Sequence, residues 1–497
     1  RQLAAAAVAG AMALSLCMPA LAETWDMSNT EKYPNGKGSW ISVYRNEDIA
    51  DHPELNGQFL EIWNSSDKPD PIKEKDEAPV LSGSFETLDL NGNEGTTVHA
   101  TLQDAHMEYN ADSSPTLTTS GKVELTLSGS NTVTHNNTNK LAIDIDDDGW
   151  PDYTPGRLTI KGSGSLTAEA PSSGIRIQNG TLDVTDGTVN ATAADNGIYA
   201  LGNTVQVSGG TLCATATGEH GTGIEASHNG QVTVSGGKLT ASGGSYGIVA
   251  GQLEMSGGTL NASANGTAAI TGSSITVNGG VLNLEDNTAP DGIISKDLNV
   301  TDGWLTAKGQ TVSANNITVS GGVMEAEALN CSQLNVSGGW VEADTLKPRE
   351  NEASSRTIKL SGGNVKLKSV PDSSFIIHFS KRARLTITEP VSEEAVRALV
   401  EAFENAQGVL YDTAYLRYKP TDYYAIPDDV GWDGIYVVYQ GTQRDPDSTL
   451  ATDDNKPLLP SDIVEIGAAP EGDAGGAIAA VVLGSAAVWG GYEVVTR

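Results

Sequence analysis

Apolar and polar residues alternate on both sides of a recurring Ser-Gly-Gly turn in the middle of the chain. The repeat reads apolar-x-apolar, Ser-Gly-Gly, x-apolar-x-Ala, and nine copies align without gaps. Period-two alternation on both sides of a turn predicts two half-buried strands per repeat, and many repeats add a third short strand. The glycines that close the nine turns are Gly187, Gly210, Gly237, Gly258, Gly280, Gly303, Gly322, Gly339 and Gly363, with a mean spacing of 22 residues.

The second and fourth positions after each turn glycine are apolar, so they lie on one side of a strand. A unit of about 22 residues is too small to bury this side alone, whereas stacked units bury a continuous column. The pattern therefore predicts an all-β fold, a parallel β-helix over residues 81–389. Because the turn glycine recurs, we expect it to have a positive φ. The column positions begin at Val189 and Ala191 and recur to Val365 and Leu367.

The flanks differ from the repeat in composition. Residues 1–22 have a basic start, an apolar run and Ala20-Leu21-Ala22, which is typical of a secretory signal peptide. Residues 23–80 are acidic, and their aromatic residues are expected to cap the open end of the solenoid. The aromatic residues are Trp25, Trp40, Tyr44, Phe59 and Trp63.

Three further segments follow the predicted solenoid. Residues 390–440 read as a small α+β module with a helix between Ser392 and Gly408 and a tyrosine-rich stretch at 411–439. We expect this stretch to pack the module, with an aromatic ligand surface as the alternative. Residues 441–474 read as a linker. Residues 475–497 carry an 18-residue uncharged run, either a membrane anchor or the lead-in to a surface-attachment module.

The repeat resembles the pectin-lyase-like, right-handed β-helix superfamily. More narrowly, it is similar to secreted surface proteins of gut Firmicutes described as carbohydrate-binding-domain-containing. VELTLSGSNTV, GRLTIKGSGSLTAEAPSSGIRI and the VSGGTL units carry the resemblance. It implies a β-helix exposed on the surface of a Gram-positive cell, with glycans or other cell-surface polymers as partners. Such scaffolds serve enzymes, adhesins and spacers alike, so the resemblance specifies fold more than function.

The net charge and the cysteine positions bear on two questions: whether the protein binds nucleic acid, and whether it forms a disulfide. With 30 Lys and Arg against 63 Asp and Glu, the formal net charge is −33. This acidity repels phosphate backbones and argues against a nucleic-acid partner. Cys17 lies in the predicted leader. Cys213 and Cys331 are separated by about five predicted coils, too far apart for a disulfide.

The sharpest local motif is the acidic stretch DIDDDGWPD. It places carboxylates at alternate positions before a glycine, a pattern similar to the calcium loops of thrombospondin type 3 repeats and dockerins. The position of the bidentate Glu of a full EF-hand is occupied by Pro155. We expect calcium here, with a solvated acidic turn as the alternative. The predicted ligands are Asp144, Asp146, Asp148, Asp152 and the carbonyl of Trp150.

Two tryptophans follow turn glycines and are expected on the outer face of the solenoid, with one coil between them. Trp304 and Trp340 would offer stacking surfaces for sugar rings. The alternative is that they pack beneath a loop or the C-terminal module.

The strongest catalytic candidates are Glu325 and Glu342 on neighbouring coils, with Lys366 one coil later. A solvated charged edge explains them better, so no catalytic residue is assigned. The sequence thus favours a non-catalytic, adhesin-like cell-surface protein with a carbohydrate- or partner-binding face. A polysaccharide lyase or glycoside hydrolase and a purely structural stalk are the alternatives.

Overall fold

The computed structural model describes thirteen stretches of the chain, and they contain strands and turns but no helix. They are residues 24–27, 39–46, 57–64, 72–92, 96–110, 114–147, 155–284, 288–349, 356–379, 383–387, 413–419, 434–440 and 463–468. The chain forms two compact units. The first comprises residues 1–315 and 322–327, and the second comprises residues 316–321 and 328–497.

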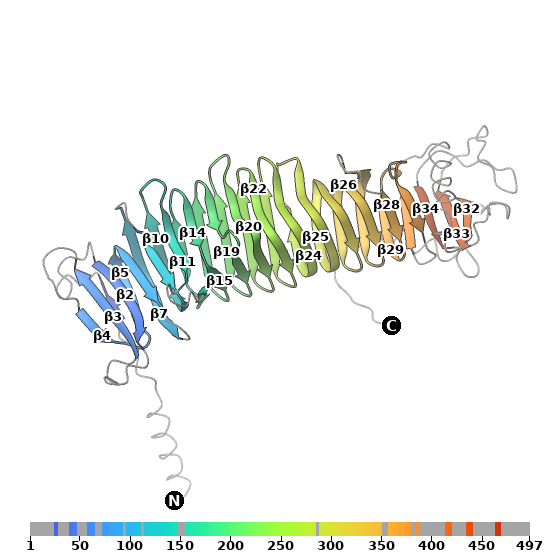
Figure 1. Cartoon of the computed structure of the whole chain (residues 1–497). Helices are drawn as coiled ribbons and strands as arrows, with labels where there is room; N and C mark the ends of the chain where they lie inside the picture. Colours follow the sequence, from blue (N-terminus) through green and yellow to red (C-terminus); the bar gives the residue numbers. More distant parts are fainter. Residues whose placement is uncertain are drawn as a thin grey trace, which may run out of the picture. The chain divides into compact units, whose positions relative to one another are not determined.

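The first unit is a parallel β-solenoid whose strands stack coil on coil (Figure 1). The long strands bend at the corners and take part in more than one sheet. Sheet 1 holds part of β7 (Thr97–Tyr109), β10 (Ser130–His135), β13 (Ser165–Glu169), β16 (Thr188–Ala193), β19 (Thr211–Ala216), β21 (Lys238–Gly243), β23 (Thr259–Ala264) and parts of β24 (Ala268–Asn283) and β25 (Asp291–Val319).

Two further sheets complete each coil. Sheet 2 holds β5 (Val80–Phe85), β9 (Lys122–Ser128), β12 (Gly156–Lys161), β15 (Gly180–Val184), β18 (Thr204–Val207) and parts of β7, β20 (Thr222–Val234), β22 (Tyr246–Met255), β24 and β25. Sheet 3 holds β6 (Thr87–Asn91), β8 (Leu117–Ser120), β11 (Leu141–Asp146), β14 (Ser173–Ile177), β17 (Asn196–Tyr199) and other parts of β20, β22, β24 and β25.

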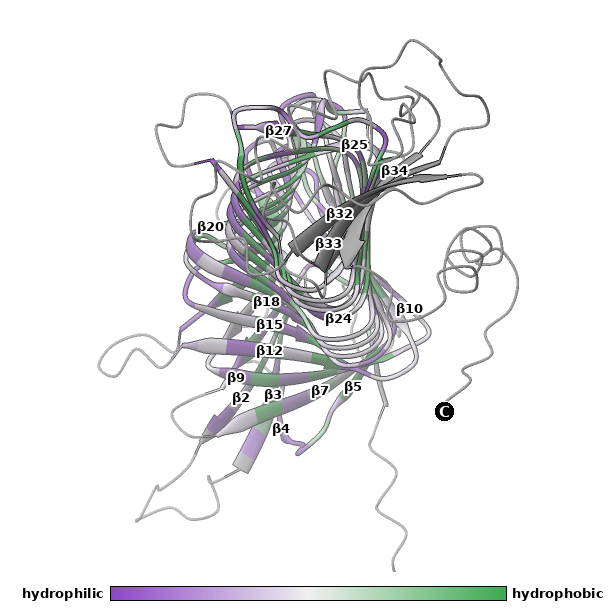
Figure 2. Cartoon of the chain, turned by 90° about the vertical axis from the view of Figure 1, so that its right-hand side faces the viewer, coloured by the Kyte–Doolittle hydropathy of each residue, from purple (hydrophilic) through white to green (hydrophobic). Residues whose placement is uncertain are grey.

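The predicted column of apolar residues is the core. Every residue two or four positions after a turn glycine, from Val189 to Leu367, is buried. Hydrophobic and hydrophilic residues alternate along strands such as β9 and β12 (Figure 2), as a sheet with one dry face requires. The predicted parallel β-helix is therefore confirmed, with about 23 residues per coil.

The turn glycines also have the predicted backbone conformation. All nine have a positive φ, between 55° and 78°. At Gly258 an added Cβ would lie 2.6 Å from backbone atoms of Gly236 and Gly237 in the preceding coil. Left-handed backbone and close coil-to-coil approach therefore both require glycine at this position.

The N-terminal flank adds antiparallel strands to the solenoid. β1 (Thr24–Asp26) pairs in parallel with β5, so parallel pairing begins before residue 81. β2 (Ser39–Asn46) pairs in parallel with β6 and antiparallel with β3 (Gly57–Asn64), which pairs antiparallel with β4 (Ile72–Lys75). Trp25 and Phe59 are buried here, whereas Trp40 is 54% exposed.

The second unit continues with parallel strands and ends in a mixed sheet. β28 (Thr357–Leu360) pairs with Gln333–Val336 of β26 (Val323–Val336) and with β30 (Ile376–Phe379). β29 (Gly363–Leu367) pairs with β27 (Trp340–Pro348) and β31 (Ala383–Ile387). β34 (Ile463–Ala468) pairs antiparallel with β31 and with β33 (Gly434–Gln440), and β33 pairs in parallel with β32 (Thr413–Lys419).

Residues 463–468 lie within the segment predicted to be a linker, but they form a strand. The predicted signal peptide, the helix before Gly408 and the apolar segment 475–497 lie outside the described residues. Within the described part of the chain, no helix is long and apolar enough to span a bilayer.

Candidate functional site

The outer face of sheet 1 in the first unit carries three rows of small, mostly uncharged polar side chains. Inward positions are filled by Val, Leu and Ala, so the alternate positions project outward. Successive members of a row are register partners on adjacent coils. The rows are Ser165, Thr188, Thr211, Lys238, Thr259, Val281 and Trp304; Thr167, Asn190, Cys213, Thr240, Asn261, Asn283 and Thr306; and Glu169, Thr192, Thr215, Ser242 and Ser263.

Hydrogen bonds along the rows fix some of these side chains. The Asn283 amide nitrogen donates to the side-chain oxygen of Asn261 at 3.2 Å, and the Ser242 hydroxyl lies 3.4 Å from that of Thr215. Coil-to-coil stacking therefore holds donors and acceptors at regular intervals. Such an array is suited to hydrogen bonding with a polymer whose units carry hydroxyl groups.

The last two residues given for the first row, Val281 and Trp304, are apolar. Trp304 and Val281 are register partners, and they are 40% and 37% exposed. Both side chains point away from the core, because Leu282 and Leu305 beside them are fully buried. The predicted outward orientation of Trp304 is therefore confirmed.

Trp340 lies in the second unit and is half-buried. Its indole nitrogen donates to a carboxylate oxygen of Glu342 at 3.3 Å, and the other oxygen of Glu342 accepts from the Lys366 ammonium at 2.8 Å. The neighbouring Val341 is buried, so Trp340 also faces outward. The prediction that Trp304 and Trp340 form one stacking surface remains a prediction.

A groove of about 410 Å³ crosses three coils where the strands of sheet 1 end. Ser242 and Ser263 of the third row line it, so the groove is continuous with the polar face. Its lining includes four glycines and the exposed residues Thr217, Glu219 and Asn265. The full lining is residues 216–219, 242–244 and 263–266.

Glycines in the groove are required by the stacking of the coils. A Cβ on Gly244 would lie 2.1 Å from the carbonyl oxygen of Gly218, and one on Gly218 would lie 2.6 Å from that of Ala194. The close approach of the coils therefore requires glycine at these positions. The sequence analysis missed the groove, although Thr-Gly-Glu, Gly-Gly and Asn-Gly at successive turns were its signal.

Comparison with known proteins follows this geometry. The model of a family described as carbohydrate-binding domain-containing protein matches residues 76–274. This segment of the chain is similar to that family. No curated protein and no solved structure matches the chain.

The carbohydrate-binding segment, residues 76–274, contains the groove and the three rows up to Asn261 and Ser263. Trp304 and Trp340 lie beyond it. The predicted resemblance to carbohydrate-binding-domain β-helix proteins is therefore confirmed.

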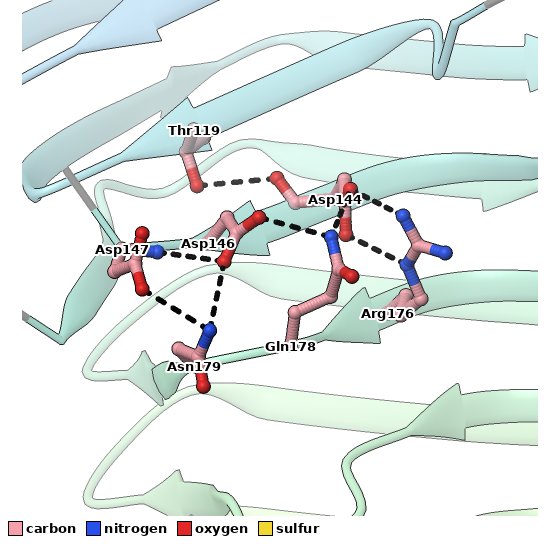
Figure 3. A network of polar contacts seen from close by, with 7 residues as sticks. All are labelled: Thr119, Asp144, Asp146, Asp147, Arg176, Gln178 and Asn179. Atoms are coloured by element: carbon pink, nitrogen blue, oxygen red, sulfur yellow. Dashed lines mark hydrogen bonds and ion pairs between the residues drawn. The ribbon is translucent and has the colours of Figure 1, made fainter. Parts of the chain in front are cut away.

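The predicted calcium motif lies partly inside the described residues of the carbohydrate-binding segment. Asp144 is buried and accepts hydrogen bonds from the Arg176 guanidinium at 2.9 and 2.6 Å (Figure 3). Gln178 donates to both Asp144 and Asp146, at 3.1 and 3.0 Å. The pKa of Arg176 is raised, chiefly by its hydrogen bond to Asp144.

Asp148, Trp150 and Asp152, the other predicted calcium ligands, lie outside the described residues. Among the residues that the structure describes, no three His, Cys, Asp or Glu residues are grouped so that they could hold a metal. The calcium site remains a prediction. Calorimetry on the full chain and on Asp146→Ala tests it, and equal heats from the two proteins would contradict it.

The carboxylates considered for catalysis lie outside the carbohydrate-binding segment and are paired with lysines. Glu325 of the first unit lies 3.1 Å from the Lys308 ammonium. Glu342 of the second unit is paired with Lys366, as described above. Each pair is the kind of partly solvated ion pair expected of a charged edge.

Proposed function

We propose that the protein is a secreted, non-catalytic carbohydrate-binding protein attached to the cell surface, with the sheet 1 face of the first unit as its glycan-binding surface. The observation that carries this proposal is the groove of about 410 Å³. It opens onto rows of Thr, Ser and Asn inside the segment that matches the carbohydrate-binding family model.

The chemistry of this face suits neutral sugars. Hydroxyl and amide groups exchange hydrogen bonds with sugar hydroxyls without the desolvation cost of a charge. The rows lie on a stacked sheet, so little conformational entropy is lost when a ligand binds. A long face with repeated donors favours extended chains over single sugars.

Aromatic stacking would extend the surface beyond the family segment. Trp304 and Val281 offer exposed apolar area, against which the C–H groups of a sugar ring would pack. The predicted signal peptide supports export, and the apolar segment 475–497 is our candidate for attachment to the membrane or cell wall. Calcium bound at the predicted acidic loop would have a structural role.

A glycan array with the full chain, combined with reducing-end analysis of the bound polysaccharides, tests the proposal. We expect binding of one or more neutral oligosaccharides without release of reducing ends. Cleavage that is lost in Glu325→Gln or Glu342→Gln would identify a polysaccharide-degrading enzyme. Binding to no glycan would favour a structural stalk.

A further inference from the structure

Positive charge is concentrated in one segment of the second unit. Residues 345–388 contain nine of the 30 lysines and arginines against three carboxylates, in a chain with a formal net charge of −33. Two of these cations, Lys366 and Lys368, form ion pairs with Glu342 and Asp344. The excess must therefore come from the others.

Three of the remaining cations border one stretch of chain, residues 372–378. The Asp372 amide donates to the carbonyl of Leu346, the residue before Lys347, at 3.1 Å. The Ile376 amide donates to the carbonyl of Arg356 at 2.9 Å. Lys359 is the register partner of His378. Backbone pairing thus places Lys347, Arg356 and Lys359 along a single segment, and we call these three residues the basic surface.

Among the residues that the structure describes, little negative charge opposes the basic surface. Lys347 and Lys359 are exposed and Arg356 is half-buried, and none of the three forms an ion pair with a described carboxylate. Asp372 is the acidic residue within the 372–378 stretch. Hydrogen bonds from Ser374 lower its pKa most, and the charges of Arg356 and Lys347 lower it further.

Two neighbouring groups complete the surface. Ile376 is 48% exposed and is the register partner of Thr357, between Arg356 and Lys359. Burial lowers the pKa of His378 most, and the charge of Lys359 lowers it further, so the imidazole is neutral near pH 7. An exposed aliphatic side chain between cations provides an apolar contact beside the charges.

We propose that the basic surface binds an acidic polysaccharide. Three cations, spread over the adjoining ends of two strands, match a chain that carries its charges at intervals. Duplex DNA presents a much denser charge, one per about 1.7 Å of axis. Single-stranded nucleic acid is held by stacking on aromatic rings, whereas the exposed apolar residue here is an isoleucine. This binding is independent of the neutral-sugar surface proposed for the first unit.

Affinity electrophoresis of the full chain in gels containing dextran sulfate or uncharged dextran tests this inference. We expect dextran sulfate to retard the protein, and this retardation should weaken as salt is added. Any retardation by uncharged dextran should not depend on the basic surface. The variant Lys347→Gln/Arg356→Gln/Lys359→Gln should bind dextran sulfate at least tenfold more weakly. Lys122→Gln/Lys140→Gln/Lys296→Gln removes the same charge from the first unit, away from the sheet 1 rows, and should bind as the wild type does.

Four results would overturn the inference: no retardation by dextran sulfate, equal binding by the basic-surface variant, an equal loss in the control variant, or tighter binding of a DNA duplex. Self-association that the basic-surface variant abolishes, without binding of dextran sulfate, would identify a second copy of the acidic chain as the partner.

Melting curves check that each variant folds. Lys359→Gln alone, at an exposed site, replaces the triple variant if the triple variant unfolds. Neutral-glycan binding should be unchanged in every variant.

Discussion

Val281 and Trp304 are register partners on adjacent coils of sheet 1, and each exposes more than a third of its surface. Apolar side chains in this position contribute nothing to the core, which is filled by Leu282 and Leu305 on the other side of the same strands. The exposed area of the pair is therefore available to a ligand, and the hypothesis that Trp304 and Trp340 bind a glycan remains to be tested.

Trp304→Ala should fold normally and weaken oligosaccharide binding about fivefold, since stacking on one ring contributes on the order of 1 kcal/mol. Trp340→Ala should weaken it further if both rings contact the same glycan. Titration calorimetry measures the affinities. Trp40→Ala, at an exposed tryptophan of the N-terminal flank, is the matched control. Unfolding of Trp304→Ala would show a packing role, and unchanged affinity would shift attention to the tyrosine-rich stretch 411–439.

Gly258→Ala should destabilise the solenoid more than Gly309→Ala. Both glycines have a φ near +70°, so each substitution costs about 1–2 kcal/mol for left-handed backbone. Only at Gly258 would the new Cβ also meet backbone 2.6 Å away, whereas nothing lies within 4 Å at Gly309. Denaturant unfolding of the two variants compares these costs. Equal destabilisation would show that the contact between coils is not tight.

The two cysteines that follow the leader should differ sharply in reactivity. Cys213 is half-buried on the outer face of sheet 1, whereas Cys331 is buried and burial raises its pKa to about 12. Both are free thiols, as predicted. In a Cys17→Ala background at pH 8, a maleimide should label Cys213 in the native protein and Cys331 only after unfolding. Labelling of both at similar rates would contradict the described packing.

Arg176→Ala should destabilise the protein by about 2 kcal/mol. It leaves the buried Asp144 carboxylate without its main partner, but the Arg176 side chain is 33% exposed, so the cost falls below that of a fully buried pair. Lys161→Ala removes an exposed partner of Glu124 and should change stability by less than about 1 kcal/mol. Chemical denaturation measures both variants. A smaller loss for Arg176→Ala than for Lys161→Ala would contradict this account.

Local sequence was enough to predict the solenoid. The positive φ of Gly187 and its eight equivalents and the buried positions from Val189 onward follow from period-two alternation and from the turn. Both depend only on residues within one repeat, so they are readable without knowledge of the coil-to-coil register.

Features that depend on contacts between coils were less predictable. Arg176 lies 32 residues after Asp144, and only the register of β11 against β14 brings them together. The groove likewise results from three turns of different length that stack at one corner. A sequence motif such as DIDDDGWPD shows which residues are acidic, but not that a guanidinium from the next coil binds the first of them.

The most direct test of the carbohydrate-binding surface is to fill the groove. Ser242→Trp/Ser263→Trp places two large side chains at its lining residues, and Ser274→Trp, the control, makes one such substitution on the outer face of sheet 2. Calorimetry with the best ligand from the glycan array measures each affinity. We predict that the groove variant melts as the control does and loses at least tenfold in affinity, while the control binds like the wild type. Unchanged binding by the folded groove variant would contradict the assignment of this surface.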